Sequence, residues 1–287
     1  MMYRTLMTAA LMFGSMASAQ TNKPTRFTVV VEGKGPDVVL IPGLSSSREV
    51  YAAEAKLLAP HYTLHLVQVN GFAGAPAGPN AEGPLLGPIV EELHDYIATK
   101  TMHPAVIGHS LGGLLTLMLA AKYPGDVEKM MIVDALPFYG LVFNKDATVE
   151  MLKPQVAAMA NQMLSMSDEQ YAATQPMAVK MMVNSPEGAK AVATSSIASD
   201  RAVSVHAMQE DMATDVRPSL SAIKTPAVLL YPFDVTAVKD PATITAVYTG
   251  AYAGMPNLKI VRVDDSRHFI MYDQPAVFDT QVQAFLK

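Results

Sequence analysis

The chain has 287 residues, half of them hydrophobic and 16% charged, so it can bury a large core, and it contains no cysteine to form disulfides. Its formal net charge of -5, with no cluster of lysine and arginine, argues against nucleic acid or an anionic membrane surface as a partner, because both require concentrated positive charge. These values predict a soluble, globular, enzyme-sized protein whose partner is a small, neutral or weakly polar molecule.

The first 19 residues resemble a secretory leader. Arg4 supplies a positive charge, residues 6–14 are apolar, and Ala17-Ser18-Ala19 before Gln20 has the small-x-small pattern of a signal-peptidase site. The apolar run is too short to span a bilayer, so no integral membrane segment is expected after the leader is removed. We therefore expect an exported protein, periplasmic or extracellular, that begins near Gln20; a retained leader is the alternative.

From residue 26 onward, short apolar or β-branched runs alternate with segments of helical spacing, which is typical of a mostly parallel α/β sheet flanked by helices. The break at residues 33–36 also predicts a hairpin between the first two strands. Strands are expected at 27–31, 38–41, 63–69, 105–107, 129–133, 227–231 and 258–263, and helices at 49–58, 86–100, 111–123, 241–253 and 274–286.

Residues 137–217 interrupt this alternation with helical runs that are separated by prolines and contain no strong strand. We interpret them as a helical cap inserted into one α/β core formed by 20–136 and 218–287. The cap is rich in methionine, whose flexible thioether suits an adaptable pocket roof; packing within the cap is the alternative. The prolines are Pro154, Pro176, Pro186 and Pro218, and the methionines are Met151, Met159, Met163, Met166, Met177, Met181, Met182, Met208 and Met212.

The central feature is the sequence Gly108-His109-Ser110-Leu111-Gly112, between an apolar strand and an apolar helix. This Gly-x-Ser-x-Gly pattern predicts a nucleophile elbow, in which glycines permit a sharp turn and the Ser110 hydroxyl is exposed at the start of the helix. A serine hydroxyl is a weak nucleophile, so it needs a neighbouring base. His268, which follows the last predicted strand, is the expected general base, and His109 is interpreted as packing around the nucleophile.

The base in turn needs a carboxylate that orients it. Asp234 follows the strand at 227–231 and satisfies the chain order serine, acid, histidine, so it is the predicted acid. Asp134 also ends a strand and remains the alternative. Asp264 and Asp265 are interpreted as bracing the loop that carries His268.

Negative charge on a carbonyl oxygen also requires hydrogen-bond donors, each contributing about 3 kcal/mol of transition-state stabilisation. The backbone N–H groups of Leu44 and Leu111 are the expected donors, and Gly43 lets the backbone approach closely. Three aromatic residues follow predicted strand ends and either face the substrate or pack the cap against the sheet; these are Phe138, Tyr139 and Phe233.

Together these motifs resemble the α/β-hydrolase superfamily, in particular its capped serine esterases and lipases, over essentially the whole mature length. Pro42-Gly43-Leu44 stands where the family carries its oxyanion loop, and residues 70–74 stand where it often has Gly-x-Gly after a strand. Two positions depart from the family pattern: Pro42 replaces a frequent histidine, and Arg267 replaces a small residue before His268.

The resemblance implies a carboxylic-ester hydrolase that forms an acyl-enzyme on Ser110, acts on small or medium, largely apolar esters, and needs no cofactor or metal. The same fold hosts lactonases, thioesterases and C–C bond hydrolases, which remain open. Dehalogenases are disfavoured because they need a carboxylate nucleophile where this chain has serine. A non-catalytic ligand-binding protein is the alternative from another class.

Overall fold

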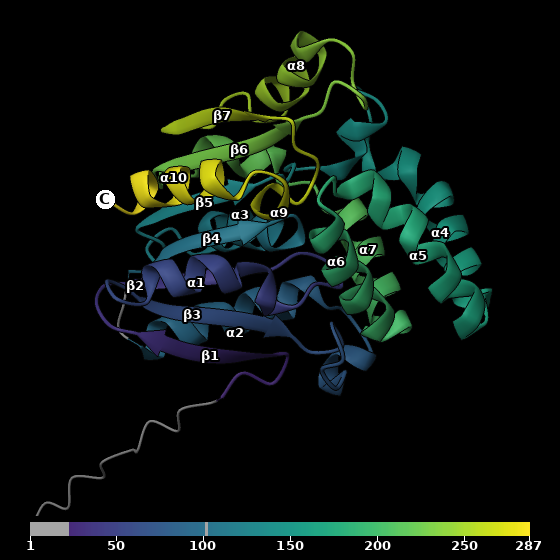
Figure 1. The fold of residues 1–287 in the computed structure, drawn as a ribbon, viewed down its shortest axis with the longest axis horizontal. Helices are drawn as coiled ribbons and strands as arrows, with labels where there is room; N and C mark the ends of the chain where they lie inside the picture. The colour runs from purple at the N-terminus through teal and green to yellow at the C-terminus, as the bar shows by residue number, and fades with distance from the viewer. Residues whose placement is uncertain (1–22, 101–102) are drawn as a thin grey trace, which may run out of the picture.

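The protein is described by a computed structural model that covers residues 23–100 and 103–287, so the predicted leader at residues 1–19 lies outside the described residues. The described residues form a seven-stranded sheet in the order β1-β3-β2-β4-β5-β6-β7 (Figure 1). β1 is antiparallel to β3, and all the other neighbours are parallel. The strands are β1 (Phe27–Gly33), β2 (Asp37–Ile41), β3 (Thr63–Val69), β4 (Ala105–His109), β5 (Lys129–Val133), β6 (Ala227–Phe233) and β7 (Leu258–Asp264).

The hairpin expected at the start of the chain is not formed. β1 pairs with β3, and β2 lies between β3 and β4 with both of its edges taken by parallel neighbours. The break at residues 33–36 therefore ends β1 without pairing it to the strand that follows. A turn signal shows where a strand ends, but which strand it pairs with depends on residues much farther along the chain.

Helices cover both faces of the sheet because neighbouring strand residues point to opposite sides. Val38 and Leu40 belong to the core under α1 and α10, whereas Val39 and Ile41 belong to the core under α2 and α3 (Figure 1). No helix within the described ranges is both long and apolar enough to cross a bilayer. The flanking helices are α1 (Ala52–Leu58), α2 (Leu86–Thr99), α3 (Leu111–Lys122), α8 (Pro241–Ala251), α9 (Ile270–Asp273) and α10 (Pro275–Leu286), and the short 3-10 helices are η1 (Arg48–Tyr51), η2 (Gly78–Ala81), η3 (Tyr139–Val142) and η4 (Arg217–Ala222).

Between β5 and β6 the chain forms α4 (Val149–Ser165), α5 (Asp168–Met182), α6 (Pro186–Ala198) and α7 (Arg201–Ala213), which gather at one end of the sheet (Figure 1). Each helix starts at a polar residue whose side chain accepts a hydrogen bond from a backbone N–H of its first turn, which satisfies one donor of the helix start. These N-caps are Thr148, Ser167, Ser185 and Asp200.

The expected division by prolines is only partly correct. Pro186 begins α6 and Pro218 lies in η4, but Pro154 and Pro176 lie inside α4 and α5. Each of these two helices continues through its proline and gives up one backbone N–H donor there. Local propensity therefore does not decide the boundaries of these two helices.

Helix α7 is fixed to the core at both of its ends. The Asp200 backbone N–H donates to Gly71 O at 2.7 Å, and a Cβ on Gly71, whose φ is +90°, would lie 2.7 Å from Val203. At the other end of α7 the two carboxylate oxygens of Glu210 accept from the backbone N–H groups of Leu85 and Leu86, at 2.7 and 2.8 Å. One helix of the insertion thus provides the N-terminal cap of α2 in the core.

Candidate active site

Ser110 occupies a sharp turn between β4 and α3. Its φ of 54° and ψ of -121° lie outside the usual regions for a residue with a side chain, and such strain persists only where surrounding contacts enforce it. The Ser110 backbone N–H donates to Val133 O at 2.9 Å. A Cβ on Gly108 would lie 2.2 Å from Gly112 O, and one on Gly112 would lie 2.2 Å from Ile41 O, so the turn requires both glycines.

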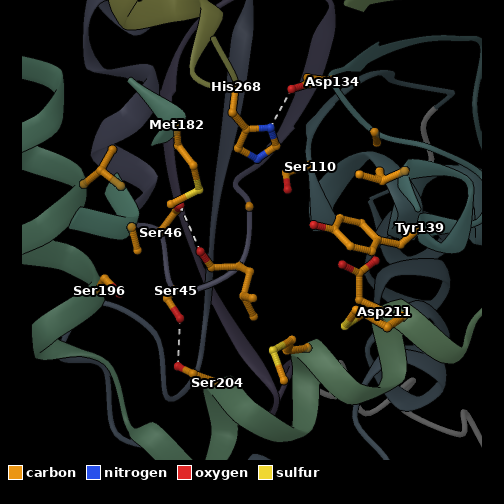
Figure 2. A pocket seen from close by; sticks show the side chains of 18 of the residues that line it. Ser45, Ser46, Ser110, Asp134, Tyr139, Met182, Ser196, Ser204, Asp211 and His268 are labelled. Carbon is orange, nitrogen blue, oxygen red and sulfur yellow. Dashed lines mark hydrogen bonds and ion pairs between the residues drawn. The ribbon is translucent and has the colours of Figure 1, made fainter. Parts of the chain in front are cut away.

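His268 lies above Ser110, in the loop that follows β7 (Figure 2). Its Nδ1 is 2.6 Å from Oδ2 of Asp134, and Oδ1 of Asp134 accepts a hydrogen bond from the Tyr248 hydroxyl. A carboxylate only accepts hydrogen bonds, so Nδ1 carries the proton and leaves Nε2, which Figure 2 shows turned toward Ser110, as the acceptor. Ser110, His268 and Asp134 therefore come together at the carboxyl ends of the strands.

Asp234 is not the partner of His268, contrary to the sequence-based expectation. Its side chain is 8% exposed and accepts from Thr236 (backbone N–H at 2.8 Å, hydroxyl at 2.6 Å), from Arg267 Nε at 2.7 Å and from Asn184 Nδ2 at 3.1 Å. Burial alone raises the pKa of Asp234, but the hydrogen bonds from Thr236, Arg267 and Asn184 outweigh it and hold this pKa well below its usual value. Asp234 is thus an ionised carboxylate committed to a separate network.

The strand register explains why Asp134, the alternative acid, is the carboxylate beside His268. His109 on β4 is paired with Val133 on β5, so Ser110 and Asp134 are the next residues on adjacent strands, at the same level. Val133 is paired with Leu230 on β6, so Asp234 lies three residues beyond that level, about 10 Å farther along an extended strand. Chain order is satisfied by both aspartates, and only the register distinguishes them.

Arg267, which departs from the family pattern, anchors the loop that carries His268. In addition to its ion pair with Asp234, its side chain donates to the Lys180 carbonyl at the end of α5, and its backbone N–H donates to Asp273 Oδ2 at 2.8 Å. The basic residue before the histidine thus binds the carboxylate that was expected to orient the histidine. The expected bracing by acidic side chains is instead carried by Asp273 and Asp234, whereas Asp264 pairs with Arg262 and the backbone carbonyl of Asp265 accepts from Gln274.

His109 has a more specific contact than the packing expected of it. It is fully buried, and its Nε2–H donates to the backbone carbonyl of His268 at 3.0 Å. Burial and the neighbouring His268 lower the pKa of His109 well below its usual value, so this imidazole is neutral. His109 therefore holds the backbone of His268 in place.

A cavity of about 670 Å³ lies between the sheet edge and the insertion, and Ser110, Asp134 and His268 line it (Figure 2). This volume falls in the usual range for small-molecule sites. Part of the lining is a set of cap methionines, as the methionine-rich cap predicted, while Met151, Met177 and Met181 are exposed instead. The lining methionines are Met159, Met163, Met166, Met182, Met208 and Met212.

Of the other residues predicted at the pocket, some line the cavity and others do not. Leu44 and Tyr139 line the cavity, but Phe138 is fully buried under Arg217 and Phe233 lies against Arg262 outside the lining. Leu111 begins α3 directly after Ser110, and its side chain is buried in the core. The use of the Leu44 and Leu111 N–H groups as oxyanion donors stays a prediction.

The polar side of the cavity was not predicted from the sequence. Ser45 and Ser46 from the loop after β2, together with Ser196 and Ser204 from α6 and α7, also line it (Figure 2). The Ser45 hydroxyl donates to Ser204 Oγ at 2.8 Å, which joins the core loop to the insertion inside the pocket wall. These serines are far apart in the sequence, and nothing in their local patterns brings them together.

Residues 38–280 match the alpha/beta hydrolase family, which is most of the chain. Together with the elbow and the sheet order, this match shows that the protein belongs to the α/β-hydrolase family. By family it is therefore a hydrolase.

Curated relatives and solved structures agree with this assignment. The chain is 34% identical over 106 residues to the pimeloyl-[acyl-carrier protein] methyl ester esterase of Chromobacterium violaceum, covering 37% of this chain and 39% of the relative. The corresponding esterase of Aeromonas hydrophila is 32% identical over 133 residues, covering 46% and 49%. The chain thus spans less than half the length of these two curated relatives.

The structural likeness is much more extensive than the sequence likeness. The esterase EaEST from Exiguobacterium antarcticum superposes with a TM-score of 0.75 at 16% identity, covering 91% of this chain and 95% of the other. The enol-lactonase from Burkholderia xenovorans LB400 gives a TM-score of 0.71 at 17% identity, covering 91% and 96%. At such identities the likeness shows the fold alone.

Proposed function

We propose that this protein is a serine esterase that hydrolyses carboxylic esters through an acyl-enzyme. The observation that carries the proposal is the placement of Ser110 on a strained elbow beneath a histidine whose Nδ1 is 2.6 Å from the Asp134 carboxylate. Nucleophile, base and orienting acid are the three parts that activate a serine hydroxyl. The esterase names of the curated relatives support the same reaction type.

In the proposed mechanism, Ser110 Oγ attacks the acyl carbon while His268 Nε2 takes its proton. Asp134 stabilises the imidazolium and keeps its orientation. The backbone N–H groups of Leu44 and Leu111 would donate to the oxyanion that forms. His268 then gives the proton to the departing alcohol, water attacks the acyl-enzyme with His268 as base, and the free acid leaves with Ser110 restored.

The pocket favours esters of small or medium size with largely apolar parts. Its volume of about 670 Å³ suits one such molecule, and the cap methionines can adapt to different acyl shapes. A lactone is a cyclic ester and needs no additional residue, and the fold likeness to the enol-lactonase keeps lactone hydrolysis as the second candidate. Turnover of lactones against linear esters of equal size would separate the two reactions.

Ser110 is the proposed nucleophile, and its loss should abolish the reaction. With the purified protein and a series of p-nitrophenyl esters from acetate to dodecanoate, Ser110→Ala is expected to lower kcat by about 10⁶-fold, as in other serine hydrolases that lose their nucleophile. A fluorophosphonate probe should label the wild type and not the variant. Undiminished turnover in Ser110→Ala would sink the assignment, and a wild type that neither labels nor hydrolyses any ester would favour the ligand-binding alternative.

We also propose that the protein is exported, on the basis of its predicted leader. The N-terminal sequence of the protein recovered from the periplasm or the medium should then begin near Gln20. Recovery of the uncleaved chain from the cytoplasm alone would contradict this proposal.

A further inference from the structure

Asp211 is a carboxylate in the pocket that the proposed catalytic steps do not use. It lies on α7 and lines the cavity, and Figure 2 shows it projecting from the insertion beside Tyr139, across the pocket from His268. In contrast to Asp134, which is held by His268 and Tyr248, its carboxylate has no hydrogen-bond partner among the residues that the structure describes. Asp211 therefore faces the cavity with its hydrogen-bonding capacity unused.

The surroundings of Asp211 are poor in positive charge. The described residues lining the cavity include neither lysine nor arginine, and their other titratable groups are His109, His268, Asp134 and several tyrosines. His109 is neutral, and the imidazole of His268 is engaged by Asp134. Burial raises the pKa of Asp211 to about 7, with a smaller opposing effect of His268.

Asp211 is half-buried and borders the cavity, and a few such polar groups in a pocket wall typically fix the orientation of a ligand. We propose that Asp211 binds a cationic amino group of the substrate, an inference that rests on the proposed esterase function of Ser110. An ammonium donates hydrogen bonds and carries the charge that the lining lacks. The substrate would then span the pocket, with its ester at Ser110 and its ammonium group at α7, and esters bearing a carboxylate there would be repelled.

The kinetic test compares isosteric esters that differ in one charge. At pH 8, p-nitrophenyl 6-aminohexanoate is compared with p-nitrophenyl heptanoate, and 3-aminopropyl hexanoate with butyl hexanoate. We expect the wild type to show a higher kcat/KM for the ammonium ester in one pair, and Asp211→Asn to lower that preference at least tenfold, mainly through KM. Glu150→Gln removes an exposed carboxylate from α4 outside the pocket and should keep the preference.

A binding test that needs no turnover uses the Ser110→Ala protein. Calorimetry should show tighter binding of n-hexylammonium than of hexanol, and adding Asp211→Asn should remove that difference. Equal binding of amine and alcohol, or a preference that survives Asp211→Asn, would overturn the inference. If the wild type hydrolyses neither member of either pair, the proposed esterase function fails while the amine-binding result still decides the role of Asp211.

Discussion

At the scale of single residues, Asp134 and Asp234 are chemically identical and differ only in their partners. The side chain of Asp134 is 9% exposed and is hydrogen-bonded to His268 and Tyr248. The side chain of Asp234 is 8% exposed and is hydrogen-bonded to Arg267, Thr236 and Asn184. Burial is thus the same at both positions. What separates them is which donors face each carboxylate, and this assigns them different expected roles.

Asp134→Asn is expected to lower kcat by about 10²- to 10⁴-fold with little change in folding, because an amide cannot hold His268 in the required tautomer. Asp234→Asn is expected to lower the melting temperature, because it weakens the ion pair with Arg267. It should change kcat by less than about tenfold, because the contact between His268 and Asp134 stays intact. Ester kinetics and thermal unfolding on both variants check this. The reverse ranking of the two kcat losses would show that Asp234 is the functional acid.

At the scale of elements, the decisive fact is how the strands align. The elbow and Asp134 follow directly from the pairing of His109 with Val133, whereas β6 continues three residues past that level before it reaches Asp234. Helix α7 contributes in the same way, since one helix supplies Ser204 and Asp211 to the pocket and Glu210 to the core. The position of the insertion is therefore fixed by contacts at both ends of α7.

The α7–α2 contact can be tested through Glu210. Glu210→Ala leaves the Leu85 and Leu86 N–H groups at the start of α2 without their acceptors, and the free energy of unfolding is expected to fall by about 1–2 kcal/mol. Urea denaturation of wild type and variant measures this loss. Glu150→Ala, at an exposed position of α4, is the matched control and should change stability by less than about 0.5 kcal/mol. Equal effects of both variants would show that Glu210 does not join cap and core.

At the scale of the whole molecule, two hydrophobic cores on the faces of one sheet carry the fold, and a third cluster lies within and beside the insertion. The proposed catalytic residues Ser110, Asp134 and His268 lie where the sheet edge meets the insertion, so the pocket belongs to neither part alone. One buried carboxyl group on a helix that flanks the sheet is expected to make the free energy of unfolding depend on pH. This is Glu54 on α1, which is 1% exposed and has no hydrogen-bond partner for either carboxylate oxygen among the described residues.

Burial raises the pKa of Glu54 from 4.5 to about 7 against a smaller opposing effect of its own backbone, and the nearby charge of Asp279 adds to the rise. The folded protein therefore keeps this proton over a range in which the unfolded chain has lost it, so the associated stability is complete below pH 4.5 and is lost as pH rises through 7. The loss is about 3 kcal/mol for a shift of this size. Glu54→Gln should flatten this decline.

Urea denaturation at pH 5 and pH 8 is the measurement. The free energy of unfolding of the wild type should fall between these values by about 1–3 kcal/mol more than that of Glu54→Gln. Glu49→Gln, which removes an exposed carboxyl five residues earlier, should behave like the wild type. Parallel declines in wild type and Glu54→Gln would contradict the prediction.

Much of this protein follows from local patterns in its sequence. The strands, the flanking helices, the elbow at Ser110 and the histidine after the last strand are predictable because each depends on neighbouring residues: periodicity, turn glycines and chain order. The methionine-rich lining follows from composition for the same reason. The continuation of α4 and α5 through their prolines was not predictable, since packing overrode a local signal.

The tertiary structure alone decided which aspartate faces His268, where the first strand pairs, and which side chains of the insertion reach the pocket. In the sequence, Asp134 and Asp234 each follow a strand, and the pattern does not distinguish them. Only the strand register shows which carboxylate lies level with Ser110. Asp211 is likewise one of two neighbouring acidic residues on α7, and the packing of that helix places it in the cavity wall. The family was readable from local sequence motifs, whereas the partners of each charge depend on contacts between segments far apart in the chain.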